Sequence, residues 1–158
     1  MPGDDQRIAK ITLDERTVVR RNADIEHERA VAIFDLLEEN AFVPKGGFAG
    51  PFHLLLALEE NRLVLDLRSV EDQPFERIML PLSPFRSIVK DYFLVCETYY
   101  NAIRTASPSR IEAIDMGRRA IHNEGSELLR ERLAEHAAID LNTARRLFTL
   151  VCVLHIRG

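Results

Sequence analysis

The sequence predicts an α+β fold: a small antiparallel β-sheet of three or four strands, with four helices packed mainly on one face. Two observations predict it. Residues 7–80 contain segments in which apolar and polar side chains alternate, and from residue 83 onward apolar side chains recur at helical spacing. A chain of 158 residues can bury one hydrophobic core, so we expect residues 1–158 to form a single domain with a loose tail at 1–6.

Four segments are typical of short strands: Arg7–Leu13, Phe52–Glu59, Arg62–Val70 and Phe75–Leu80. The third is the clearest, because its leucines at 63, 65 and 67 share one face and its charged residues at 62, 66 and 68 share the other. Only short turns separate the last three segments, which predicts an antiparallel meander. Pairing of the first segment with this meander would make a four-stranded sheet.

The helices expected at Asp24–Asn40 and Pro84–Thr105 each have apolar residues at i, i+3, i+4 spacing. Asp24 is the expected N-cap of the first helix and Asn40 its expected end. Ser83 is expected to cap the second helix, since Pro84 fits a first helical turn. We expect this second helix to cover the sheet.

Two further helices are expected at Ser109–His136 and Leu141–Ile156. In the first, Ser109 and Glu112 have the spacing of a capping box. The last helix has Asp140 or Asn142 as its N-cap. Its apolar part from residue 147 onward could also form a buried strand, because it contains several β-branched residues.

Residues 41–51 contain three glycines and two prolines, so no regular element is expected there. The sequence Lys45-Gly46-Gly47 superficially suggests a phosphate-binding loop. It lacks the GxxxxGK[ST] order that surrounds a phosphate with backbone amides and a lysine. A flexible connection is therefore the better interpretation.

Composition and charge exclude several classes of protein. With 46% hydrophobic and 29% charged residues and a net charge of -4, the chain has the composition of a soluble globular protein. Nucleic acid is not expected as a partner, because residues 1–106 hold 13 basic against 18 acidic side chains and residues 107–158 hold 8 against 7. No apolar run is long enough to span a membrane. The cysteines, Cys96 and Cys152, lie in apolar runs, which predicts buried thiols and a reducing, cytoplasmic location.

The segment Ile111–Leu133 combines strong helix signals with many chemically capable side chains. Projected at about 100° per residue, its first sixteen residues fall on two arcs. The polar arc consists of Glu112, Asp115, Arg118, Arg119, His122, Asn123 and Ser126, and the small-residue arc of Ala113, Ile114, Met116, Gly117, Ala120, Ile121 and Gly125. Glu124 lies in the middle of the small-residue arc.

If the small-residue arc packs against another helix, an ionised Glu124 needs a partner to offset its desolvation. Arg145 and Arg146 share one arc of the last helix and are the expected partners. Such an ion pair would lock the two C-terminal helices together. Alternatively, Gly125 and Ser126 break the helix, and Glu124 is then a residue at a helix end.

The polar arc permits two interpretations. Asp115, Arg119 and His122 lie at i, i+4, i+7, so a carboxylate, a guanidinium and an imidazole could together bind an anion and move a proton. Exposed helices use the same spacing for weak supporting pairs, which is the commoner case. The candidate polar or anion site comprises Asp115, Arg118, Arg119, His122, Glu124, Arg145 and Arg146. No catalytic residue is assigned and no metal or cofactor is expected, since HExxH and paired-cysteine spacings do not occur.

Four long blocks of the sequence carry a resemblance. They are EHERAVAIFDLLEEN (26–40), KDYFLVCETYYNAI (90–103), IDMGRRAIHNEGSELL (114–129) and TARRLFTLVCVLH (143–155). Together they resemble a bacterial family catalogued as uncharacterised, number 0262 in the UPF series, over nearly the whole chain. The resemblance implies a bacterial cytoplasmic origin, and it brings no reaction, cofactor or site residue to this sequence.

For function we expect a non-enzymatic binding or regulatory protein, whose partner is another protein or a small anionic ligand. This expectation rests mainly on the absence of a strong catalytic signature. The alternative is a small enzyme that acts on a phosphate or carboxylate substrate through acid–base chemistry of His122 and Glu124. Convergence of these two residues with Arg145 in one accessible cleft would favour the enzyme. If Glu124 is structural, Glu124→Gln should lower thermal stability markedly and His122→Ala only slightly.

Overall fold

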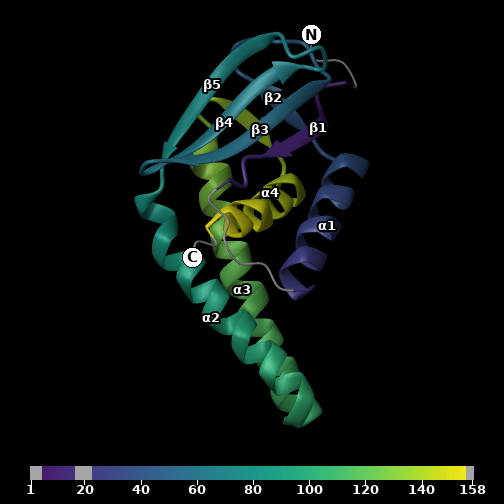
Figure 1. The fold of residues 1–158 in the computed structure, drawn as a ribbon, viewed down its shortest axis with the longest axis vertical. Helices are drawn as coiled ribbons and strands as arrows, with labels where there is room; N and C mark the ends of the chain where they lie inside the picture. The colour runs from purple at the N-terminus through teal and green to yellow at the C-terminus, as the bar shows by residue number, and fades with distance from the viewer. Residues whose placement is uncertain (1–4, 17–22, 156–158) are drawn as a thin grey trace.

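The computed structural model describes residues 5–16 and 23–155 and consists of a sheet layer with helices on one side of it (Figure 1). The elements in chain order are β1 (Ile8–Leu13), α1 (Ala23–Glu38), β2 (Phe42–Pro44), β3 (Phe52–Glu59), β4 (Arg62–Ser69), β5 (Pro74–Pro81), α2 (Ser83–Thr105), α3 (Pro108–Leu133), β6 (Ala137–Ile139) and α4 (Leu141–Leu154). The predicted α+β class and the four helices are confirmed. Most of the tail predicted at residues 1–6 lies outside the described residues; Gln6 donates to the Phe48 carbonyl and accepts from the Gly50 amide.

The main sheet has the strand order β1-β3-β4-β5. Strands β3, β4 and β5 form the predicted antiparallel meander, with Leu63, Leu65 and Leu67 at most 1% exposed on the core side. Strand β1 joins them as predicted, but it pairs with β3 in parallel, so the expectation of a wholly antiparallel sheet is wrong. The chain crosses from β1 to β3 through α1, and such a crossover returns the chain in the same direction.

A second, two-stranded sheet pairs β2 with β6 in antiparallel register, Phe42 opposite Ile139. Sequence reasoning expected no regular element in residues 41–51 and expected the third helix to reach His136, and both expectations are wrong here. Three-residue strands are too short to show a period, and their pairing joins segments about a hundred residues apart. The pairing buries Phe42 completely.

Helix α1 packs its apolar face inward, with Ala32 and Leu36 buried. Asn40 fixes the end of this helix, near where the sequence predicted it. Its side-chain amide donates to the carbonyls of Leu36 (2.7 Å) and Ile8 (2.9 Å), and its side-chain oxygen accepts from the Ile8 amide (2.6 Å). One side chain therefore joins α1 to the backbone of β1.

Helices α2 and α3 form a long antiparallel pair that extends away from the sheet (Figure 1). The prediction that α2 covers the sheet is wrong: α4 occupies that position, and α2 packs along α3. Both predicted caps also differ. Leu82 occupies the N-cap of α2 without a side-chain hydrogen bond, and Ser107, not Ser109, caps α3 by accepting from the Arg110 amide. Pro108 suits the first turn of α3, so the helix starts before the predicted capping box.

Helix α4 is buried on most sides, which explains its continuous apolar sequence. Of the two predicted caps, Asp140 is the N-cap of α4, and it accepts from the Thr143 amide at 2.8 Å. The helical interpretation is therefore correct as far as Leu154, and Ile156 lies outside the described residues. None of the helices in the described part of the chain combines the length and apolar character that a membrane crossing requires.

Helix α3 continues through Gly125 without a break, so that alternative is excluded. Gly125 is buried because the ring of Phe148 from α4 lies against it. The absence of a side chain at this position allows α3 and α4 to approach closely.

Candidate functional site

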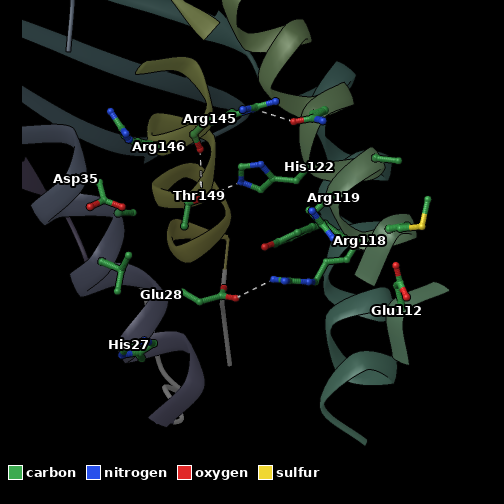
Figure 2. Close-up of a pocket in the computed structure, with 16 residues that line it drawn as sticks. His27, Glu28, Asp35, Glu112, Arg118, Arg119, His122, Arg145, Arg146 and Thr149 are labelled. Carbon is green, nitrogen blue, oxygen red and sulfur yellow. Dashed lines mark hydrogen bonds and ion pairs between the residues drawn. The ribbon is translucent and has the colours of Figure 1, made fainter. Parts of the chain in front are cut away.

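A pocket of about 930 Å³ lies among the helices, below the sheet. Helix α1 forms one wall, α3 the opposite wall, and α4 the wall between them (Figure 2). Its lining is mostly polar or charged: His27, Glu28, Val31, Ala32, Asp35, Tyr92, Glu112, Met116, Arg118, Arg119, Ala120, His122, Asn123, Arg145, Arg146 and Thr149. A pocket of this size is in the range of small-molecule sites.

The orientation of α3 differs from the expected one. Much of the polar arc faces the protein interior, while Met116, Gly117, Ala120 and Glu124 are exposed. Of the small-residue arc, Gly125 is buried against Phe148. Glu124 forms no ion pair with either arginine of α4 among the described residues, so the predicted ion pair between the two C-terminal helices is wrong. The polar arc can face inward because partners from α1, α2 and α4 satisfy its hydrogen bonds.

Arg118 is the centre of these partnerships. Its guanidinium donates to Asp115 at 2.6 and 3.0 Å, lies 3.8 Å from the carboxylate of Glu28 on α1, and stacks 4.6 Å from the ring centre of Tyr99. The Arg118 hydrogen bond is the main reason that the pKa of Asp115 is lowered. Tyr100 of α2 donates to Glu28 at 2.8 Å. Arg118 therefore joins α1, α2 and α3, and the carboxylates of Asp115 and Glu28 largely neutralise its charge.

His122 forms the inner end of the pocket. Its Nε2 lies 2.8 Å from the hydroxyl of Thr149, and Thr149 donates to the Arg145 carbonyl at 3.2 Å. Nε2 and the Thr149 hydroxyl therefore share a hydrogen bond, and Ser126 Oγ lies 3.5 Å from Nδ1 of the same ring. The ring also packs between Tyr92 and Phe148, at centre distances of 5.2 and 5.3 Å.

Burial, with the positive charges of Arg145 and Arg118, lowers the pKa of His122 to about 4. The unfolded chain therefore binds more protons than the folded one between pH 4 and about 6.5, and the free energy of unfolding should increase with pH across that window. We expect a gain of about 2 kcal/mol between pH 4.5 and pH 7, after allowance for partial solvent access. Urea unfolding at both pH values measures it. His122→Gln, which cannot titrate, should lose most of this dependence; an unchanged slope would contradict the assignment.

The side chains of Arg145 and Arg146 point from α4 toward opposite walls of the pocket (Figure 2). Arg145 donates to the side-chain oxygens of Asn123 (2.9 Å) and Asn142 (3.4 Å), and Arg146 donates to the carbonyl of Glu39 (2.8 Å). All of these acceptors are neutral. In the described residues, no carboxylate forms an ion pair with either arginine, so their charge is available to a ligand.

Of the seven candidate residues, the structure places Arg118, Arg119, His122, Arg145 and Arg146 around one pocket. Asp115 does not line the pocket, but its carboxylate forms ion pairs with Arg118 at 2.6 Å and with Arg119 at 2.8 Å. Glu124 lies outside. Sequence reasoning missed the residues that α1 contributes, Glu28 and Asp35 among them, because nothing local to α1 shows which helix it faces.

Comparison with known proteins assigns a family. The sequence model of the uncharacterised protein family UPF0262 matches residues 5–157. A UPF0262 protein of Paramagnetospirillum magneticum is 60% identical over 153 residues, which cover 97% of this chain and 98% of the relative. One of Rhodospirillum rubrum is 60% identical over 155 residues, covering 98% and 96%, and one of Bradyrhizobium is 58% identical over 160 residues, covering 99% and 95%.

No solved structure matches the chain. The family match spans both sheets and all four helices, including every residue that lines the pocket. The resemblance carried by the four sequence blocks is thereby confirmed, and the chain belongs to the bacterial UPF0262 family.

Proposed function

We propose that this protein is a cytoplasmic binding or regulatory protein whose helical pocket takes a small anionic ligand carrying a phosphate or carboxylate group. The observation that carries the proposal is the pair Arg145 and Arg146: both line the pocket, and both have only neutral hydrogen-bond acceptors among the described residues. A guanidinium binds phosphate and carboxylate oxygens through paired hydrogen bonds. The two free cysteines, both buried, fit a reducing compartment.

His122 supports a binding role more than a catalytic one. Its Nε2 is already hydrogen-bonded to Thr149, and its low pKa leaves the imidazole neutral at pH 7. Glu124, the other residue of the His/Glu acid–base alternative, is exposed and does not line the pocket. The pocket therefore brings together His122 and Arg145 without Glu124, the carboxylate that the enzymatic alternative required.

Calorimetric titration with inorganic phosphate and with citrate tests the proposal. We expect Arg145→Gln and Arg146→Gln each to weaken binding about 10-fold, because each removes a charge-assisted hydrogen bond. Arg132→Gln is the matched control: Arg132 is exposed on α3 and does not line the pocket. Its substitution removes the same formal charge and should leave the affinity unchanged.

Equal weakening by all three variants would show general charge attraction rather than a site, and would refute the proposal. Failure of both probes to bind the wild-type chain at millimolar concentration would also refute it. Binding should decrease as salt increases, since a charged contact is screened.

A further inference from the structure

The sheet carries a second cluster of reactive side chains, on the face opposite to the helices. Thr12 lies on the edge strand β1, His53 on β3, and Asp72 in the turn between β4 and β5. His53 alternates with the core residues Phe52 and Leu54, so its side chain leaves the sheet on the other face. Thr12 Oγ1 lies 2.8 Å from His53 Nε2, and His53 Nδ1 lies 2.5 Å from Asp72 Oδ1. A hydroxyl, an imidazole and a carboxylate thus form one hydrogen-bonded chain.

The positions of the protons follow from the acceptors. An ionised carboxylate can only accept a hydrogen bond, so His53 Nδ1 carries the imidazole proton and donates a hydrogen bond to Asp72. This hydrogen bond from His53 is the main reason that the pKa of Asp72 is lowered. His53 Nε2 then presents its lone pair, and the Thr12 hydroxyl donates to it. A nucleophile, a base and a group that orients the base have the same relation in hydrolases with a catalytic triad.

The hydrogen-bonded side chains of this cluster differ in their exposure to solvent. The side chain of His53 is 5% exposed, whereas Thr12 is exposed, so the base is shielded from water and the hydroxyl is accessible. Asp72 is held in the left-handed region at φ 68°, and its amide donates to the Ser69 carbonyl at 2.9 Å. Backbone in this region is disfavoured for most residues, and at functional sites it fixes a side chain in position.

Positive charge lies beside the cluster. Lys10 on β1 and Arg68 on β4 are the register partners of His53 on its two sides, so all three share one face of the sheet. Arg68 is paired with Asp66 at 2.8 Å, and Lys10 is exposed. Cations near a reacting hydroxyl stabilise the oxyanion that forms when a carbonyl is attacked.

We propose that Thr12 is a nucleophile for acyl transfer, with His53 as its general base and Asp72 as the residue that orients His53. The Thr12 oxygen bonds to the acyl carbon of an ester while its proton passes to His53 Nε2. The bond from the acyl carbon to the leaving oxygen breaks, and that oxygen takes the proton from His53. Water then attacks the acyl carbon of acyl-Thr12 while one of its protons passes to Nε2. The bond from the acyl carbon to Thr12 Oγ1 breaks, Nε2 returns the proton to Oγ1, and the carboxylic acid and the free threonine are released. None of the three residues lines the anion pocket, so this site is independent of it.

The test is incubation of the full chain with p-nitrophenyl acetate, followed by nitrophenolate release and by peptide mass spectrometry of the acetyl adduct. We expect acetyl on Thr12 in the wild type. Thr12→Val keeps the shape of the side chain without the hydroxyl and should reduce the release rate about 100-fold, the lower end of general-base effects. Thr12→Ser should retain adduct and rate, and Asp72→Asn should slow both. Thr98→Val is the control, since Thr98 is an exposed threonine on α2.

Acetyl found only on Lys10 or elsewhere, or equal rates for the wild type and Thr12→Val, would overturn the proposal. A purely structural triad also has a distinct result: Thr12→Val would lower the melting temperature, and no adduct would form on Thr12 in the wild type. Circular dichroism checks the folding of each variant. If Thr12→Val does not fold, the adduct position in the wild type and in Thr12→Ser decides the question.

Discussion

Replacing Gly125 by alanine is expected to destabilise the fold by about 3 kcal/mol, the upper end of the range for overpacked cores. A Cβ added at Gly125 would lie 2.1 Å from Cζ of Phe148 and 2.4 and 2.6 Å from its two Cε atoms. Phe148 is fully buried and packs against Tyr92 and His122, so its ring cannot move aside without disturbing the inner end of the pocket. The change should also weaken anion binding.

Gly117 provides the matched control in the same helix. It is exposed, and a Cβ added there would meet nothing within 4 Å. Gly117→Ala should therefore stabilise the protein by about 0.5–1 kcal/mol through helix propensity alone. Urea unfolding of the two variants measures the difference. Similar stabilities for both would show that α3 and α4 are not in the close contact described above.

His122→Ala is expected to cost about 3 kcal/mol, whereas Glu124→Gln should change the free energy of unfolding by less than about 0.5 kcal/mol. The alanine leaves a cavity between two aromatic rings and deprives Thr149 of a hydrogen-bond partner. Glu124 is exposed, so its substitution removes no buried contact. This order is the reverse of the one that the sequence suggested.

Thermal melting and urea unfolding of both variants at pH 7 decide between the two orders. His122→Asn separates the two contributions of the imidazole, because it keeps a polar group near Thr149 and loses much of the ring packing. We expect its stability to lie between those of the wild type and of His122→Ala. A large loss in Glu124→Gln with little change in His122→Ala would restore the expectation drawn from the sequence.

Local patterns predicted the elements of this fold well. The alternating leucines of β4 and the helical spacing along α1, α2 and α4 depend on neighbours in sequence, and each element was found within a few residues of its predicted bounds. Asp140 was one of the two predicted caps of α4 for the same reason, since a cap is a contact between a residue and the next turn.

Contacts between distant segments could not be predicted in this way. The parallel pairing of β1, the β2–β6 sheet and the contact of Glu28 with Arg118 each join parts of the chain that no short pattern connects. The orientation of α3 was predicted only in part for a related reason: a small-residue arc normally predicts helix contact, and here Gly125 makes such a contact while Gly117 and Ala120 are exposed. Here the polar arc faces inward because other helices supply its partners, and only the assembled fold reveals those partners.

The same limit applies to the two sites. Four arginines of the helical pocket were among the predicted candidates because they lie on two neighbouring helices with clear periodicity. The cluster of Thr12, His53 and Asp72 was missed, because its three members come from two strands and a turn spread over sixty residues.

The pairing of β2 with β6 also determines the order in which the molecule can fold. Residues 42–44 reach their partners only after residues 137–139 have been synthesised, and α1 packs against α4, the last helix. During translation the meander of β3, β4 and β5 and the hairpin of α2 and α3 can form early, because their contacts are close in sequence. Phe42 and the apolar face of α1 therefore lack these partners until residues 137–154 have been synthesised.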